Sequence, residues 1–571
     1  MGTCKHGRST NIQLAEDVNL TFNSQAYNKL GAPSNGLGWI HQLIIGATGT
    51  GKSRSFVRPN IYSLPTDPLT GRAISMVITG PKGELLNDTG AFLKYHGYEI
   101  KVFNLEKMEC SDCYNPFAYI HSEEDVAVLV DVLVANMGGG KDKGDHWIAN
   151  ATAVLKSICY YIYYEVPYVD ANFANVLHYL NMWGSSEEDD FESEYDKLIN
   201  DLEAQKGAGH SAVIWRRSVS AKGQELGSII STASTICSIF NQSSLQTLTK
   251  TDSLELDKLG DRPTTLYVIS SPTTSAFNFL IAILYSQLFV LLQNKANKTY
   301  KNQGMTLPHK VWFLLDEFAN TGKIPAFDEK ITLIRSAGMF CSIIVQAPSQ
   351  ITAVYDKTAP TIMSNCSVTL FLGAPGNTAK DDSAADFISQ NLGKKTIQAE
   401  QTSVNFEKDN EKRFSYSYSA TERPLMTPDE VKRLPGDECI ILLGGQKPII
   451  AKKLSKLEEC MNYDIYKKIG NYNVEEEKNT QKTYYEGRLK SEAIQAVLEA
   501  DKRIEHARRL GIKEVDLKFE QGDLTKEVRA TSSIPAETTF ANKTVEDIKP
   551  EIKVYNWREE FDDPEDIEKE E

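Results

Sequence analysis

The sequence predicts an α/β protein with a mostly parallel sheet, helices inserted into the sheet domain and a charged C-terminal tail. Three observations predict this class: β-rich runs that alternate with helical stretches, a glycine-rich motif between one run and a helix, and a long interval without strands. At 571 residues the chain exceeds the size that one hydrophobic core supports. Its 41% hydrophobic and 24% charged residues are ordinary for a globular protein.

Eight β-rich runs are the basis of the sheet prediction. Several are continuous apolar stretches, as expected for strands that are buried on both faces. Their alternation with helical stretches predicts parallel strands joined by right-handed crossovers. The runs are 41–47, 73–79, 98–105, 264–271, 309–316, 340–347, 367–374 and 437–444.

The strand pattern stops between about residue 122 and residue 255. This interval has helical periodicity, so we expect part of it to form a helical subdomain inserted in the sheet domain. The expected helices are 124–137, 147–165, 171–182 and 190–204.

The C-terminal part of the chain has a different composition. Beyond about residue 455 the density of apolar residues falls, and 484–510 has the pattern of one charged helix. Residues 520–571 are polar and end in EEFDDPEDIEKEE, which is typical of a solvated, disordered tail.

One glycine-rich segment is the strongest chemical signal. It reads GATGTGKS and matches the P-loop pattern G-x-x-x-x-G-K-[ST] at every fixed position. It follows the run HQLII and precedes a helix expected over 53–63, which is the context that the motif requires. The alternative, a glycine-rich turn with a chance Lys-Ser pair, does not predict that context. The expected nucleotide-binding residues are Gly46, Ala47, Thr48, Gly49, Thr50, Gly51, Lys52 and Ser53.

Each part of the P-loop has an expected role with ATP and Mg²⁺. The glycines let backbone N–H groups turn toward the phosphates, and the following helix adds the positive end of its dipole. We expect Lys52 to contact the β- and γ-phosphates and the Ser53 hydroxyl to bind Mg²⁺.

A second motif ends in two adjacent carboxylates. The apolar run KVWFLL is followed by Asp316 and Glu317. A P-loop ATPase needs an Asp at a strand end to hold Mg²⁺ and a carboxylate to deprotonate the attacking water. We therefore expect Asp316 on the metal side and Glu317 as the catalytic base. The alternative is a strand that simply ends in a charged turn.

Two further candidates rest on weaker arguments. Gln346 ends the run FCSIIVQ, where it could sense the γ-phosphate, and Arg335 follows a helical stretch after Asp316. An exposed arginine could act as a finger on the ATP of a neighbouring subunit. A surface arginine and a capping glutamine explain the same residues, so both interpretations stay open.

Several sequence blocks together resemble the type IV secretion coupling proteins, the TraG/TraD-like conjugation ATPases, and most closely their Gram-positive branch. The resemblance runs from about residue 17 to residue 455. Several blocks in the right order are much more specific than a P-loop alone. The blocks are 46–60, 79–90, 103–120, 311–327, 331–339, 343–351 and 425–445.

The resemblance implies a RecA-like motor domain with an inserted all-α domain, assembled as a homo-hexameric ring. Such a ring couples ATP hydrolysis to the passage of single-stranded DNA, with its attached relaxase, into a type IV secretion channel at the cytoplasmic face of the membrane. By the same resemblance, Arg335 matches the family's arginine finger and Gln346 its sensor glutamine.

The resemblance also sets the expected domain boundaries. The RecA-like domain would comprise 1–165 and 223–455, interrupted by an all-α domain at 166–222. In the family this all-α domain meets the DNA and the relaxase. The charged, partly disordered tail would comprise 456–571.

Two departures from the family stand out. The family usually has Asp where this chain has Gly80, and it usually begins with transmembrane helices. Here the longest apolar stretch, 280–292, is shorter than the ~20 residues that a membrane helix needs. We expect it to be a buried core helix, and we expect no transmembrane segment in this chain.

The net charge of −15 argues against a protein that coats nucleic acid non-specifically, but it is compatible with a channel that has local basic patches. Two alternative functions stay open. One is an FtsK-like DNA translocase that works within one cell, although the LDEFAN and RLPGDE blocks favour conjugation. The other is a substrate receptor whose ATP cycle gates assembly without pumping.

Overall fold

The computed structural model places Met1–Glu477 in one compact unit. The charged helix predicted at 484–510 and the acidic tail predicted at 520–571 lie outside the described residues. The structure describes residues 3–4, 8–21, 40–67, 69–137, 145–184, 191–271, 273–374, 383–406, 412–460 and 462–475.

A nine-stranded sheet forms the centre of this unit, with the order β15-β14-β11-β5-β10-β9-β6-β8-β7. The strands from β7 to β11 are parallel, β14 is antiparallel to β11, and β15 is antiparallel to β14. All eight predicted runs belong to this sheet, so the predicted α/β class is confirmed. The strands are β5 (His41–Ile45), β6 (Ser75–Pro81), β7 (Glu99–Asn104), β8 (Thr264–Ser270), β9 (Val311–Leu315), β10 (Met339–Val345), β11 (Cys366–Phe371), β14 (Glu438–Leu443) and β15 (Ile449–Lys452).

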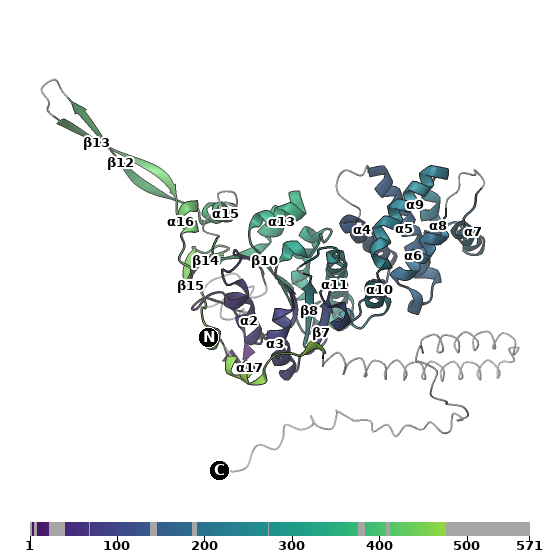
Figure 1. The fold of residues 1–571 in the computed structure, drawn as a ribbon. Coiled ribbons are helices and arrows are strands. Elements are labelled where there is room, and N and C mark those ends of the chain that lie inside the picture. Colours follow the sequence, from purple (N-terminus) through teal and green to yellow (C-terminus); the bar gives the residue numbers. More distant parts are fainter. Residues whose placement is uncertain are drawn as a thin grey trace, which may run out of the picture. The chain divides into compact units, whose positions relative to one another are not determined.

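Side chains of the central strands alternate between two hydrophobic layers. Leu43 and Ile45 of β5 lie in one layer and Ile44 in the other, while Phe313 and Trp312 of β9 divide in the same way. This alternation is the period of a strand, and it explains why each run is apolar at every position. α2, α3 and α17 cover one face, and α11 to α15 cover the other (Figure 1).

Short helices and two small hairpins complete the sheet domain. β1 (Thr3–Cys4) pairs with β2 (Arg8–Ser9), and β3 (Asn11–Gln13) pairs with β4 (Asn19–Thr21). The helices are α2 (Arg58–Tyr62), α3 (Glu84–Tyr95), α11 (Asn278–Lys298), α12 (Phe327–Leu333), α13 (Pro348–Tyr355), α14 (Ala359–Ser364), α15 (Ser383–Leu392), α16 (Pro428–Lys432) and α17 (Tyr463–Ile469).

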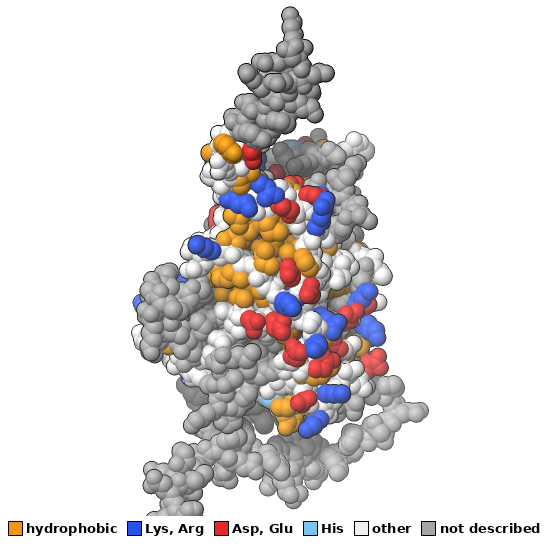
Figure 2. Space-filling view, turned by 90° about the vertical axis from the view of Figure 1, so that its left-hand side faces the viewer, with side chains coloured by type: hydrophobic (Ala, Val, Ile, Leu, Met, Phe, Trp, Pro, Cys, Tyr) orange, Lys and Arg blue, Asp and Glu red, His pale blue; other side chains and the backbone are white. Residues whose placement is uncertain are grey.

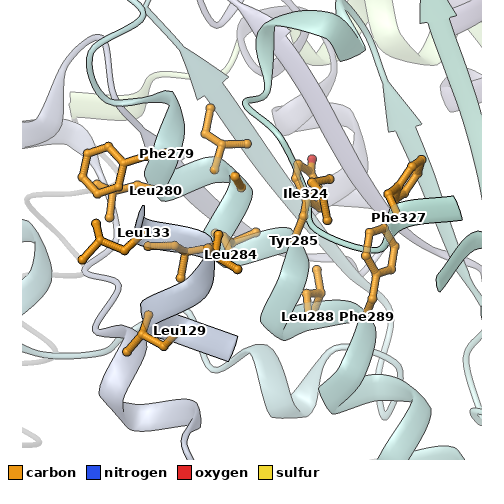
Figure 3. Packing of buried hydrophobic residues seen from close by; sticks show 14 of the residues in the cluster. Leu129, Leu133, Phe279, Leu280, Leu284, Tyr285, Leu288, Phe289, Ile324 and Phe327 are labelled. Carbon is orange, nitrogen blue, oxygen red and sulfur yellow. The ribbon is translucent and has the colours of Figure 1, made fainter. Parts of the chain in front are cut away.

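α11 contains the apolar stretch that we expected to be a core helix. It is long and apolar enough to cross a membrane, but 72% of its most apolar window is buried inside the protein. Figure 3 shows Leu280 and Leu284 beside Leu129 and Leu133 of α4, and Phe289 beside Phe327. α11 is therefore a core helix that joins the sheet to the helical region.

The helical interval is confirmed as helices, and they pack mainly on one another. α5 packs against α4, α8 and α9, so the packed group extends beyond residues 166–222 on both sides (Figure 1). Its members are α4 (Glu123–Met137), α5 (Asp145–Glu165), α6 (Phe173–Met182), α7 (Glu194–Lys206), α8 (Ser211–Ser218), α9 (Gly223–Cys237) and α10 (Ser243–Lys250).

A long hairpin, β12 (Lys394–Phe406) with β13 (Lys412–Pro424), was not predicted from the sequence. It extends away from α15 and α16 (Figure 1). Figure 2 shows hydrophobic side chains gathered on this end of the molecule, below the base of the hairpin. Two large hydrophobic residues of this end are well exposed, Leu425 at 41% and Ile450 at 53%.

Candidate nucleotide-binding site

Three neighbouring strands bring the predicted site residues to one edge of the sheet. Gly46 follows β5, Gln346 follows β10 and Asp316 follows β9, and β10 pairs in parallel with both other strands. Parallel strands end at the same edge of a sheet, so motifs about 300 residues apart in the chain meet there.

The P-loop has the backbone that its glycines permit. Gly51 adopts φ 96°, a left-handed conformation that side chains disfavour. A Cβ at Gly46 would lie 2.5 Å from the Thr50 hydroxyl oxygen, so the turn has no room for a side chain there. The helix that follows begins with a π-helical turn, η2 (Lys52–Val57), and continues as α2.

Lys52 folds back over the P-loop. Its Nζ donates to the carbonyl oxygens of Gly46 at 2.8 Å and of Ala47 at 3.2 Å. Burial lowers the pKa of Lys52, and the nearby carboxylates of Asp316 and Glu317 oppose that shift. The cation therefore lies between the loop and both predicted carboxylates.

Asp316 lies deepest in the site, with 7% of its surface exposed. The Ser53 hydroxyl donates to its Oδ2 at 3.4 Å. Burial raises the pKa of Asp316 from 3.8 to about 6, although the charge of Lys52 opposes the shift. A buried carboxylate beside a hydroxyl is a pair of oxygen ligands of the kind that Mg²⁺ prefers.

Glu317 follows in a strained backbone conformation, with φ 52°. Non-glycine residues rarely adopt this region, and such outliers cluster at functional sites. The Asn320 side chain donates to Glu317 Oε2 at 3.0 Å and thereby orients the carboxylate.

Gln346 lies beside this group. Together with Lys52, Glu317 and Asn320 it lines a small recess at the end of β10. Its backbone N–H donates to the Gln350 side-chain oxygen at 2.8 Å, which fixes the turn after the strand. The structure thus brings Gln346 to the place where we expected a phosphate sensor.

A cleft of about 880 Å³ opens in front of the P-loop. Its walls come from the P-loop, the end of β6 that contains Gly80, a hydroxyl-rich loop after β8, and the carboxylate motif. The lining residues include Thr48, Gly49, Gly51, Lys52, Ser53, Gly80, Lys82, Glu84, Ser270, Ser271, Thr273, Thr274, Ser275, Asp316, Glu317 and Asn320.

Arg335 lies apart from this cleft. It is exposed in the helical turn η10 (Ile334–Ala337), just before β10 begins, whereas Gln346 follows the other end of the same strand. Burial lowers the pKa of His41, the first residue of β5, to about 4, and the charge of Arg335 contributes to that shift. The seven residues of β10 span roughly 20 Å, which separates Arg335 from the chain's own P-loop.

The family model described as "Type IV secretory system Conjugative DNA transfer" matches residues 12–495. The chain belongs to this family. The predicted resemblance is therefore confirmed at the level of the family, while the Gram-positive branch stays a prediction.

Relatives within the conjugative DNA transfer family are distant in sequence. Conjugal transfer protein TraG from Escherichia coli is 25% identical over 425 residues, which cover 69% of this chain and 62% of TraG. Protein VirD4 from Agrobacterium fabrum is 24% identical over 433 residues, which cover 74% of this chain and 59% of VirD4. The chain thus spans less than two thirds of the length of these relatives.

Solved structures share the fold of this family member. A bacterial conjugative coupling protein, TrwBdeltaN70, matches with a TM-score of 0.54 and 18% identity, covering 78% of this chain and 89% of that one. TrwB in complex with ADP and Mg²⁺ matches with a TM-score of 0.52 and 18% identity, covering 74% and 88%. These likenesses confirm the α/β fold with its mostly parallel sheet.

Two residues of the site in this family member were missed from the sequence. Asn320 lies three residues after Glu317. This spacing of one helical turn could have predicted that the two side chains meet. Lys453 follows β15, a strand that was not predicted, and its side chain donates to the P-loop carbonyl of Thr50 at 3.3 Å. No spacing in the sequence pointed to that contact.

Proposed function

We propose that this protein is the ATPase of a conjugation system, which drives relaxase-bound single-stranded DNA into a type IV secretion channel. The observation that carries the ATPase proposal is the convergence of the P-loop with Asp316 and Glu317 in one cleft, with Ser53 Oγ 3.4 Å from Asp316 Oδ2. Membership of the conjugative DNA transfer family supports the choice of substrate and channel.

The residues of the cleft fit ATP and Mg²⁺. Ser53 and Asp316 would hold Mg²⁺, which supplies neutralising charge for the phosphates. Lys52 would leave the Gly46 and Ala47 carbonyls to contact the β- and γ-phosphates, while the backbone of Gly49 to Ser53 surrounds them. TrwB has been solved with an ATP analogue and with ADP and Mg²⁺, which supports this choice of ligands.

Glu317 would accept the proton of the attacking water. Its carboxylate lies at the cleft beside Lys52, and the hydrogen bond from Asn320 directs it. Gln346, on the same side, would contact the water or the γ-phosphate as a sensor. The water attacks phosphorus as the proton moves to Glu317, and ADP leaves with its charge stabilised by Lys52.

We propose that the active form is a homo-hexameric ring in which Arg335 serves the neighbouring subunit. Arg335 is exposed and is separated from its own cleft by the length of β10. Hydrophobic side chains gather on the surface below the hairpin (Figure 2), which supports burial against another copy, because large apolar patches on a protein surface usually mark interaction sites.

The remaining assignments follow the family. In the family's division the RecA-like domain would comprise 1–165 and 223–455, and the all-α domain 166–222 would meet the DNA and relaxase, with the packed helices α4, α5, α9 and α10 extending that helical group on both sides. Within the tail 456–571, α17 covers a face of the sheet, so the part beyond α17 would contribute to partner choice. The ring would work at the cytoplasmic face of the membrane beside the channel proteins.

ATP hydrolysis with and without single-stranded DNA tests this function. We expect stimulation by single-stranded DNA that falls steeply between ~50 and ~200 mM salt, because binding must rely on local basic groups in a chain of net charge −15. A rate that is indifferent to DNA at both salt concentrations would reject the motor.

Translocation assays separate the alternatives. Movement along a labelled single strand supports a motor, whereas ATP hydrolysis without movement supports a receptor that gates assembly. A strong preference for duplex DNA would instead support an FtsK-like translocase, since stacking on single strands would then have no role.

A further inference from the structure

A buried lysine at the antiparallel end of the sheet contacts the P-loop from outside the cleft. Lys453 directly follows β15, and 7% of its surface is exposed. Its Nζ donates to the Thr50 carbonyl at 3.3 Å and to the Gly436 carbonyl at 2.8 Å. Its backbone N–H donates to the Asp437 carbonyl at 2.7 Å, so main chain and side chain are both anchored to the segment before β14.

The Lys453 ammonium group has backbone hydrogen-bond partners. Within the described part of the chain it forms no ion pair with a carboxylate, and it donates to two carbonyl oxygens. Burial lowers the pKa of Lys453, and Cys439 and Asp437 oppose that shift. Since a buried cation that forms no ion pair is costly, negative charge that binds nearby should lower its free energy.

The contact also acts on the peptide group that it touches. The Thr50 carbonyl and the Gly51 N–H belong to one planar trans peptide and point in opposite directions. Lys453 on the carbonyl oxygen side therefore fixes the Gly51 N–H toward the opposite side of the loop. Gly51, with φ 96° and no side chain, would otherwise allow this peptide to rotate easily.

We propose that Lys453 is a positioning residue for the nucleotide: it fixes the Thr50–Gly51 peptide and places positive charge behind the phosphates. The inference rests on the proposed role of the P-loop. Glu317 and Lys453 would then have different roles: Glu317 acts on the chemical step, whereas Lys453 raises the affinity for phosphate.

The test compares Lys453→Met with Lys452→Met in the full chain. Methionine keeps the length and the apolar stem of the lysine but removes the charge and the donors. Lys452 is the adjacent lysine, exposed at the end of the same strand, and provides a matched loss of charge. The measurements are the Kd of Mg²⁺-ADP, competition by pyrophosphate, kcat and KM for ATP, and thermal unfolding without nucleotide.

We expect Lys453→Met to weaken ADP and pyrophosphate about tenfold each and to raise KM by a similar factor, as for the loss of one charge-assisted hydrogen bond. The kcat should change less than about threefold, and Lys452→Met should match the wild type. Lys453→Arg, which keeps charge and donors, should recover most of the affinity for both ligands.

Unchanged affinity for ADP and pyrophosphate in folded Lys453→Met overturns the inference, and so does a lower unfolding temperature without any loss of affinity. If Lys453→Met does not fold, Lys453→Gln replaces it under the same criterion. Lys52→Ala distinguishes failure of the proposed P-loop function from failure of the proposed Lys453 role. If Lys52→Ala binds ADP normally, the P-loop assignment is wrong. If Lys52→Ala loses ADP binding and Lys453→Met does not, only the role of Lys453 is wrong.

Discussion

The centre of the sheet and its antiparallel end both deliver polar groups to the P-loop, by different routes. β5, β10 and β9 are parallel neighbours whose ends supply the P-loop, Gln346 and Asp316 directly. β15 reaches the same edge because two successive antiparallel pairings restore the direction of β11, and Lys453 follows it there. A residue that follows an edge strand without a recognisable motif thus contacts the P-loop.

The two regions also differ in what they contact. The groups of the centre line the cleft, whereas Lys453 reaches the backbone of the P-loop away from it. Mutation of Glu317 at the centre should therefore change the rate of chemistry, whereas mutation of Lys453 at the antiparallel end should change the affinity for nucleotide. Arg335 lies at the amino-terminal end of β10, away from the P-loop, and its mutation should affect ATP hydrolysis by a neighbouring subunit.

The largest expected effect on the ATPase rate is that of Arg335→Ala. This variant tests whether Arg335, before the amino-terminal end of β10, completes the ATP site of another subunit. Because an arginine finger is typically worth ~10³–10⁵ in rate, the variant alone should be nearly inactive. Mixing it with inactive Lys52→Ala should restore activity, since roughly a quarter of interfaces in a closed ring would hold every group. ATPase rates of the mixtures at low ATP are the measurement.

Ser336→Ala, an exposed neighbour of Arg335, is the control for this experiment and should behave as the wild type. If mixing fails to restore activity while subunit exchange is shown independently, Arg335 does not act across an interface.

Glu317→Gln should show the next largest effect and isolate the chemistry of the centre. Loss of the base should lower kcat by ~10²–10⁴, with ADP affinity within about twofold of the wild type. Glu84→Gln, an exposed glutamate on another wall of the cleft, is the matched control and should keep its rate. Normal hydrolysis by Glu317→Gln would show that another group accepts the proton.

Asp316 gives the centre a pH dependence. Its pKa in the folded protein, about 6, lies above the ordinary value of 3.8, so the folded state without Mg²⁺ binds the proton more tightly than the unfolded chain. The free energy of unfolding should therefore fall as pH rises from about 4 to about 6. Asp316→Asn should remove this decrease in the free energy of unfolding with rising pH. Above pH 7 the variant should therefore be more stable than the wild type by up to about 3 kcal/mol.

Denaturant unfolding without Mg²⁺ between about pH 4 and about pH 8 measures this effect, and the ATPase activity of the same variant should be lost. A variant that is less stable than the wild type above pH 7 would show that Asp316 stabilises the fold in its charged form.

The smallest effect is expected from truncation after residue 520, which lies beyond both the family match and the compact unit. Steady-state ATPase activity should stay within about twofold, because the removed segment has too few apolar residues to contribute to a core. An unfolded or aggregated product would show that the tail packs on the rest of the chain.

Local sequence predicted much of the fold. Runs such as HQLII and VWFLL are apolar at every position, which is the pattern of a strand buried on both faces, and their positions were confirmed. β12 and β13 were missed because β12, KKTIQAEQTSVNF, has few apolar residues and no constant alternation, and because both strands lie outside the central sheet. β15 was missed because its four residues are half exposed and too short for a clear period.

The sequence by itself identified the residues that meet at the centre: GATGTGKS, the pair Asp316–Glu317 and the strand-end Gln346 are local motifs that need no tertiary information. Only the tertiary structure decided that Arg335 and the P-loop lie at opposite ends of the parallel strands and that Lys453 contacts Thr50. Those relations depend on strand order and direction, which bring together residues as far apart as 403 positions in the chain. Pairing of that kind leaves no local period in the sequence, because it is fixed by how the strands assemble.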